Sequence, residues 1–116
     1  MLDKHLNEVV NKTWNFAGRA TSLREEKFNA FMGLASEAGE TLDILKKEAF
    51  HSEKPSSFFA EKYLSELGDV AYYWLKAVEL SGFTPEEVLA YNRKKLASRH
   101  PELGEVTERF GKDAIK

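Results

Sequence analysis

Apolar residues recur every three or four positions along most of the chain, which is the spacing of one face of an α-helix. The first amphipathic stretch covers about residues 2–17, and a break at residues 18–24 follows it. The second stretch covers about residues 25–49. The apolar positions of the two stretches are Leu2, Leu6, Val9, Val10 and Trp14, then Phe28, Phe31, Leu34, Ala35, Ala38, Leu42 and Leu45. The pattern predicts two helices joined by a short loop.

Two further helices are predicted, at about residues 57–81 and 85–99. Pro55 and the serines around it are typical of a turn that offers an N-cap for the next helix. Gly82 is suited to end the third helix, because glycine adopts the left-handed backbone conformation at little cost. The run Thr84-Pro85-Glu86-Glu87 combines a capping box with proline at the first helical position. It therefore marks the start of the fourth helix. The apolar face of the third helix is formed by Ala60, Leu64, Leu67, Ala71, Trp74 and Val78.

Strand signals are weak, so the fold class that we expect is all-α, an antiparallel arrangement like a four-helix bundle. Residues 1–101 form one domain in this interpretation, and residues 102–116 form a polar C-terminal tail. The apolar surfaces of the second and third helices exceed what one opposing helix can cover. We therefore expect a homodimer or homotetramer. The side chains behind this expectation include Phe58, Phe59, Tyr72, Tyr73 and Trp74.

Composition excludes several classes of function. The chain has 116 residues, a net charge of -2 and no cysteine, which excludes disulfides, zinc–thiolate sites and cysteine nucleophiles. The net charge gives no long-range attraction to nucleic acids or acidic membranes, so neither is expected as a partner. The sequence contains no apolar run of membrane-spanning length, and residues 1–20 lack the apolar core of a signal peptide. We expect a cytoplasmic protein.

Two acidic pairs stand out within the predicted helices. Glu37 and Glu40 lie three residues apart on the second helix, and Glu66 and Asp69 do so on the third. Residues three apart on a helix are neighbours, so each pair directs two carboxylates to one place. Four carboxylates on two packed helices repel one another unless a cation lies among them. All-oxygen ligation without histidine suits Mg²⁺, Mn²⁺ or Ca²⁺, and an open carboxylate cluster is typical of Mg²⁺, with Mn²⁺ as a possible substitute.

The spacing alone also fits surface carboxylates that bind nothing, because similar pairs occur at Glu40/Asp43 and in the polar tail. The local charges distinguish these pairs. Asp43 has lysines within one helical turn, whereas Glu37, Glu40 and Asp69 have no Lys or Arg three or four residues away. Both interpretations remain open on the pattern alone.

Asn92, Lys95 and Arg99 fall on one sector of the fourth helix. Asn92 lies among apolar positions, and we expect a buried amide followed by two cations, which suits an anionic ligand. The alternative is an asparagine that bonds to a neighbouring helix, with both cations extending to water. Metal together with Lys and Arg is common in the chemistry of phosphoryl groups.

Three motifs resemble the MazG-like, all-α nucleoside triphosphate pyrophosphohydrolases. They are GLASEAGE, LSELGDVAYYWL and Asn92-x-x-Lys95-x-x-x-Arg99-His100-Pro101, and together they span roughly residues 30–101. The resemblance implies an enzyme, a hydrolase of phosphoric anhydrides that converts a (d)NTP to a (d)NMP and pyrophosphate. It also implies roles for the motif residues. The metal ligands would be Glu37, Glu40, Glu66 and Asp69, with Glu37 or Glu40 also acting as general base, and the substrate contacts would be Asn92, Lys95 and Arg99.

Recognition of the nucleotide is less defined by the motifs. Trp14 is a candidate to stack on the base and Tyr73 to contact the sugar, although aromatic residues at helical spacing are more often part of a core. Two other functions remain open. One is a narrow-specificity dUTPase or dCTP pyrophosphatase, and the other is a non-catalytic helical module that binds nucleotides or a protein partner.

Overall fold

The computed structural model describes residues 4–17, 22–51 and 53–103. Every regular element in these residues is helical: α1 (Lys4–Ala17), α2 (Leu23–Phe50), α3 (Ser56–Leu80), α4 (Pro85–Arg99) and the short 3₁₀ helix η1 (Pro101–Leu103). The all-α prediction is therefore confirmed for this part of the chain, and the predicted helix limits agree to within two residues where they are described. Residues 2 and 3 of the first predicted helix, and most of the predicted tail, lie outside the described residues.

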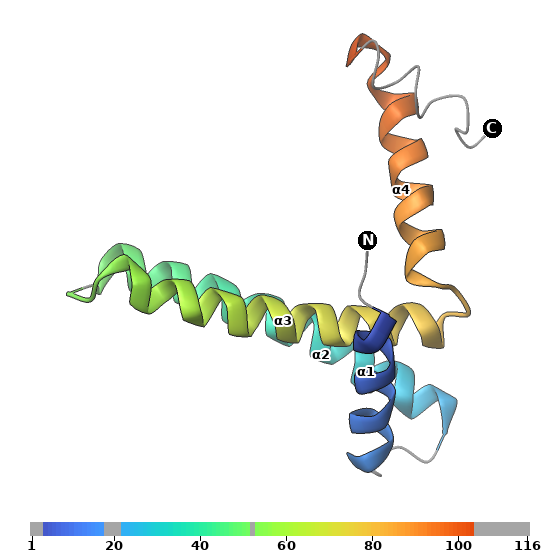
Figure 1. The fold of residues 1–116 in the computed structure, drawn as a ribbon, viewed down its shortest axis with the longest axis horizontal. Helices are drawn as coiled ribbons and strands as arrows, with labels where there is room; N and C mark the ends of the chain where they lie inside the picture. Colours follow the sequence, from blue (N-terminus) through green and yellow to red (C-terminus); the bar gives the residue numbers. More distant parts are fainter. Residues whose placement is uncertain (1–3, 18–21, 52, 104–116) are drawn as a thin grey trace. The chain divides into compact units, whose positions relative to one another are not determined.

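The chain divides into two compact units after Ser81. In the first unit α2 and α3 form a long antiparallel hairpin, and α1 packs against α3 (Figure 1). The second unit contains α4 and η1. The predicted division into residues 1–101 and a tail remains a prediction. None of the described helices is both long enough and apolar enough to cross a membrane.

Local capping explains where the helices begin and end. Thr84 and Glu87 form the predicted capping box, with the Glu87 backbone N–H donating to Thr84 Oγ1 at 3.2 Å. Gly82 has a φ of 88°, as expected for the residue that ends α3. At the start of α3 the serine cap is a wrong prediction, because the N-cap position is occupied by Pro55, which has no side chain able to accept a hydrogen bond. The Phe58 N–H instead donates to the Pro55 carbonyl at 3.0 Å.

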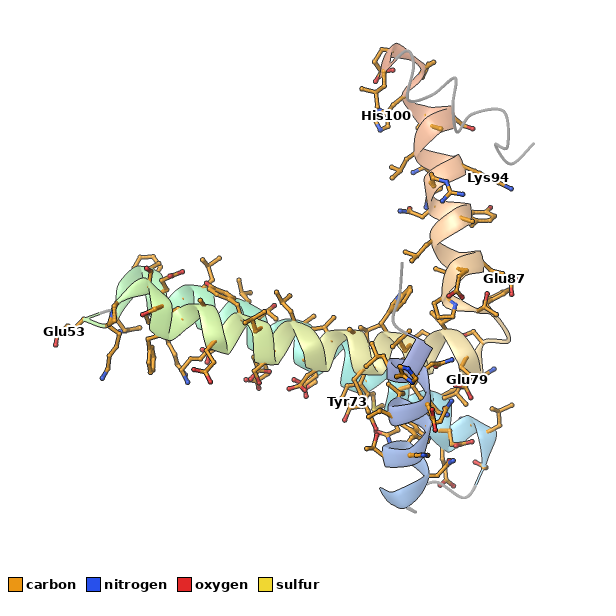
Figure 2. The ribbon with its side chains drawn as sticks, in the orientation of Figure 1. Glu53, Tyr73, Glu79, Glu87, Lys94 and His100 are labelled. Atoms are coloured by element: carbon orange, nitrogen blue, oxygen red, sulfur yellow. The ribbon has the colours of Figure 1, made fainter. Side chains whose placement is uncertain are left out.

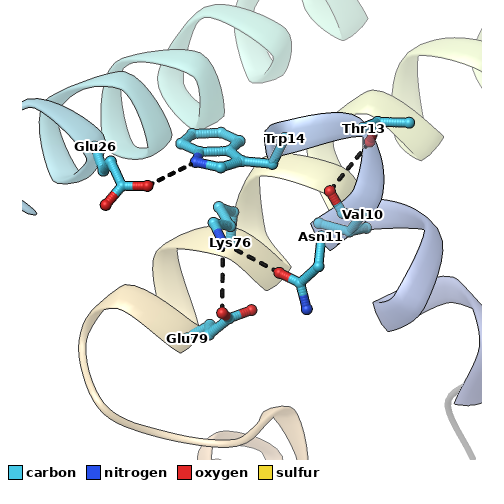
Figure 3. Close-up of polar contacts among 7 residues, drawn as sticks. All are labelled: Val10, Asn11, Thr13, Trp14, Glu26, Lys76 and Glu79. Atoms are coloured by element: carbon cyan, nitrogen blue, oxygen red, sulfur yellow. Dashed lines mark hydrogen bonds and ion pairs between the residues drawn. The ribbon is translucent and has the colours of Figure 1, made fainter. Parts of the chain in front are cut away.

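The core of the first unit lies where α1, α2 and α3 meet. Trp14, Ala30 and Ala77 are buried there, and Tyr72 and Tyr73 pack around them. A methyl group on Gly33 would overlap the Tyr73 ring, so glycine is what allows this ring to lie against α2. Trp14 Nε1–H donates to Glu26 Oε1 at 3.1 Å, which satisfies the buried indole (Figure 3).

Lys76 is a buried cation in this core, only 4% exposed. Its Nζ donates to Asn11 Oδ1 at 3.1 Å, lies 3.4 Å from Glu79 Oε1 and stands 5.3 Å from the centre of the Trp14 ring (Figure 3). These contacts replace the hydrogen bonds to water that the buried ammonium group loses, and they hold α1 against α3.

Much of the predicted apolar stripe is exposed in the single chain. Leu64 is 75% exposed, and of the stripe predicted for the third helix only Val78 is buried. The other buried positions of this helix are Phe59, Leu75, Lys76 and Ala77. The reason is geometric, since among the described residues α2 and α3 have only each other to pack against along most of the hairpin. The exposed apolar residues of the hairpin include Phe28, Phe31, Met32, Leu42, Leu45, Leu64 and Leu67.

Candidate metal centre

The antiparallel hairpin brings acids from α2 and α3 together. Carboxylate oxygens of Glu37, Glu66 and Asp69 all lie within 4.8 Å of one another. Glu37 and Glu66 are partly buried and Asp69 is exposed. In an antiparallel hairpin, positions at similar distances from the turn lie opposite each other, so motifs 29 residues apart in sequence, at Glu37 and Glu66, become neighbours in space.

Glu40 is not within the 4.8 Å group, although it was predicted as a ligand together with the other three acids. It is exposed and lies one helical turn nearer the α2–α3 turn. Its negative charge still contributes to the raised pKa of Glu37, so Glu40 remains near that carboxylate. The structure thus assembles three of the four predicted acids tightly and leaves the fourth at the edge of the group.

The pKa of Glu37 is raised above its ordinary value near 4.5. The largest cause is loss of contact with water, followed by a hydrogen bond with the Glu66 carboxyl group. The negative charges of Asp69, Glu66 and Glu40 raise it further. A hydrogen bond between two carboxyl groups requires a proton on one of them, which is why this bond raises the pKa of Glu37.

The residues present fit a hard divalent cation. Magnesium holds oxygen ligands at about 2 Å, so ligands on opposite sides of the ion are about 4 Å apart. The 4.8 Å limit among the three carboxylates is close to this value, and small side-chain rotations close the difference. All the donors are oxygens, as Mg²⁺ and Mn²⁺ prefer.

The raised pKa of Glu37 predicts how pH affects stability in the absence of divalent ions. Between its ordinary pKa near 4.5 and its raised pKa, the folded protein retains a proton that the unfolded chain releases. Glu37 therefore lowers the free energy of unfolding as pH rises through this interval. Glu37→Gln should remove this pH dependence. The free energy of unfolding of the variant, relative to that of wild type, should therefore increase as pH rises. Urea unfolding in EDTA from about pH 4 to about pH 7 measures the difference.

Glu61→Gln is the matched control for this experiment, because Glu61 is an exposed acid on α3. Its stability relative to wild type should be nearly independent of pH. Equal pH profiles for wild type and Glu37→Gln would contradict the assignment of Glu37 to the acidic group.

A cavity of about 450 Å³ lies between α2 and α3 on the turn side of the acids. Glu40, Glu66 and Asp43 contribute carboxylates to its lining, Ile44, Phe58 and Phe59 contribute apolar surface, and Lys47, His51, Lys54 and Lys62 contribute nitrogen. Sequence reasoning missed these lysines. Lys47 lies three residues before the end of α2 and Lys62 lies six residues after the start of α3, so counting residues outward from the turn could have placed both near it.

The two aromatic candidates differ in position. Trp14 is buried, 8% exposed, with its rings among Ala30, Ala77 and two tyrosines. This burial favours the core role over stacking on a nucleobase. Tyr73 is partly buried and lies one turn from Asp69 on α3, far from Glu53 at the α2–α3 turn (Figure 2). Because it lies one helical turn from Asp69, Tyr73 remains a candidate for contact with the substrate.

The predicted anion-binding residues all lie on α4 in the second unit. Asn92 and Arg99 are exposed and Lys95 is partly buried. The expected buried amide at Asn92 is not observed, because the neighbouring Leu89 and Leu96 are themselves nearly half exposed in the single chain. Asn92, Lys95 and Arg99 keep the i, i+3, i+7 spacing that places them on one side of the helix.

The comparison with known families agrees with the acidic motifs. Residues 28–104 match the family described as MazG nucleotide pyrophosphohydrolase domain, a span that includes all four acids as well as Asn92, Lys95 and Arg99. No curated protein and no solved structure gives a significant match to the chain. Because the matched span covers well over half of the chain and contains the acidic centre, the protein belongs to the MazG nucleotide pyrophosphohydrolase domain family.

Proposed function

We propose that the protein is a Mg²⁺-dependent pyrophosphohydrolase that cleaves nucleoside triphosphates, (d)NTPs, to (d)NMPs and pyrophosphate. The observation that carries the proposal is the meeting of Glu37, Glu66 and Asp69 from two antiparallel helices. Family membership supports the class of reaction.

Glu37, Glu66 and Asp69 would hold the metal, with Glu40 as a further ligand or as the base. A divalent ion bound there supplies positive charge to the phosphate oxygens and makes water more acidic. Glu37 and Glu40 are both candidates for the general base. We favour Glu40, because the oxygens of Glu37 are directed to Glu66 and Asp69, whereas Glu40 lies at the edge of the group and lines the cavity.

The remaining predicted contacts keep their roles in this proposal. Lys95 and Arg99 would neutralise phosphate oxygens, and Asn92 would bond to phosphate, sugar or base. Tyr73 would contact the sugar. We leave Trp14 out of the proposed site, because its ring is buried in the core.

A homodimer or homotetramer is part of the proposal. The exposed apolar side chains of the hairpin, such as Phe28 and Phe31, would be covered by a second copy. A cytoplasmic location is likewise proposed. Light scattering at micromolar concentration tests the assembly, and a mass equal to that of one chain would argue against it.

Phosphate release from a panel of canonical (d)NTPs, with Mg²⁺ and added inorganic pyrophosphatase, tests the reaction. We expect turnover that requires the pyrophosphatase for detection and that EDTA abolishes, with Mn²⁺ as a working substitute for Mg²⁺. Turnover of several bases supports a broad enzyme. Turnover of dUTP or dCTP alone would identify the narrow-specificity alternative, and no turnover of any nucleotide would favour a binding module.

A further inference from the structure

We propose that the contact between Gly33 and the ring of Tyr73 positions the proposed metal ligands, by fixing the spacing between α2 and α3 next to the acidic group. The acidic group is Glu37, Glu66 and Asp69, whose carboxylate oxygens lie within 4.8 Å of one another. Gly33 and Tyr73 are positioning residues in this inference, which rests on the proposed function. The role concerns the aromatic ring of Tyr73 and is separate from contact of Tyr73 with the sugar.

The contact lies one helical turn from the acids on both helices. Gly33 precedes Glu37 by four residues on α2. Tyr73 follows Asp69 by four residues on α3. Residues four apart share one face of a helix, and in an antiparallel hairpin a step toward the start of one helix matches a step toward the end of the other. Only about 6 Å of helix therefore separates the Gly33–Tyr73 contact from the carboxylates, and a change in spacing at the contact reaches them.

The space between Gly33 and the Tyr73 ring does not admit a methyl group. A Cβ atom on Gly33 would lie 2.8 Å from Tyr73 Cγ and nearer still to the ring carbons Cδ1 and Cε1. Cγ lies on the axis of ring rotation, so turning the ring does not move this atom away. Relief requires either a different χ1 rotamer of Tyr73 or a shift of α2 relative to α3.

Neighbouring rings oppose a change of rotamer at Tyr73. The centre of its ring lies 6.3 Å from that of Trp14 and 5.2 Å from that of Tyr72, and both pairs pack edge to face. Trp14 is 8% exposed, and its indole N–H donates to Glu26 of α2 at 3.1 Å. Because the Tyr73 ring has packed neighbours on α1 and α3, we expect a side chain at position 33 to displace α2 instead.

Binding of Mn²⁺ to the full chain, followed by the paramagnetic signal of the free ion, tests the inference without depending on turnover. Gly33→Ala should weaken Mn²⁺ binding by about tenfold, which is within the range that residues supporting metal ligands contribute. Alanine favours a helix more than glycine does, so a weaker α2 would not explain the loss. Gly39→Ala is the matched control, because an added Cβ on this glycine of the same helix meets nothing within 4 Å. Its Mn²⁺ affinity should stay within about twofold of wild type.

Variants of Tyr73 show whether the ring is what Gly33→Ala disturbs. Tyr73→Ala removes the ring and should weaken Mn²⁺ binding by itself, which tests the inference even if Gly33→Ala does not fold. In the Tyr73→Ala background, Gly33→Ala should change the Mn²⁺ affinity by less than about twofold, because the two substitutions disturb the same contact. Tyr73→Phe retains the ring carbons that face Gly33 and should keep the Mn²⁺ affinity within about twofold of wild type. Circular dichroism checks the helix content of each variant.

The outcomes separate this inference from the proposed function. Unchanged Mn²⁺ affinity in Gly33→Ala at native helix content would overturn the inference, even if the protein hydrolyses nucleotides. An equal loss in Gly33→Ala and Gly39→Ala, or a loss from Gly33→Ala that is the same with and without the Tyr73 ring, would overturn it as well. Mn²⁺ affinity that depends on this contact in a protein without turnover would support the inference and count against the proposed reaction. A wild-type protein that binds no Mn²⁺ would overturn both.

Discussion

Asp69→Asn is expected to lower kcat by about 100-fold or more while leaving the helices intact. Asp69 is exposed, so the amide costs little in folding, and its oxygen lies within 4.8 Å of the Glu37 and Glu66 oxygens. Replacing one of the proposed anionic ligands by a neutral one should weaken the binding of a divalent ion, whose contribution to transition-state stabilisation is several kcal/mol. Steady-state turnover of the best nucleotide at saturating Mg²⁺ measures the effect, and circular dichroism checks the fold.

A second measurement separates loss of metal from loss of some other function. Binding of Mn²⁺, followed by the paramagnetic signal of the free ion, should weaken in Asp69→Asn and stay unchanged in Glu61→Gln. Glu61 is the appropriate control because it is an exposed acid of the same helix. Near-normal turnover or unchanged Mn²⁺ affinity in Asp69→Asn would show that the ligand assignment is wrong.

Trp14→Ala is expected to lower the free energy of unfolding by about 3–5 kcal/mol, which is the usual cost of truncating a large buried aromatic side chain. The ring fills the space between α1, α2 and α3, contacts Ala30 and Ala77, and interacts with the ammonium group of Lys76. Losing it removes these contacts and also leaves Glu26 without its indole partner. The free energy of unfolding of small domains is only about 5–15 kcal/mol, so this substitution should remove a large part of the protein's stability. Urea unfolding followed by circular dichroism measures it.

Trp14→Phe distinguishes the core role from the alternative in which Trp14 stacks on a base. Phenylalanine keeps most of the buried apolar volume, so the variant should fold and keep the KM of wild type within about twofold, while its stability falls less than that of Trp14→Ala. A KM that rises severalfold at unchanged helix content would return Trp14 to the substrate site.

Helix positions could be predicted because their causes are local. Thr84, Pro85 and Glu87 lie within four residues, and their hydrogen bonds fix the start of α4 without help from the rest of the chain. Gly82 ends α3 through its own backbone conformation. The serine N-cap of α3 was predicted wrongly. The pattern shows a turn around Pro55, but it does not specify which residue of this turn takes the N-cap position.

Burial was harder to predict, because it depends on how many neighbours a helix has. Leu64 and Leu67 lie on a regular apolar stripe, yet both are more than half exposed in the single chain. Lys76 shows the opposite case. Lysine is usually a surface residue. The burial of Lys76 depends on contacts with Asn11 and Trp14 of α1, which lie more than 60 residues away in the sequence.

The sequence by itself determined the helices, the family and the identity of the acids, because capping, periodicity and the spacing within one helix are properties of neighbouring residues. Only the tertiary structure decided which acids meet. The register between α2 and α3 places Glu37 with Glu66 and Asp69, leaves Glu40 at the edge, and opens a cavity toward Lys54 and Lys62. Packing at the other end of the hairpin places Trp14 in the core. These results depend on distances between helices, and the spacing of residues within one helix does not determine those distances.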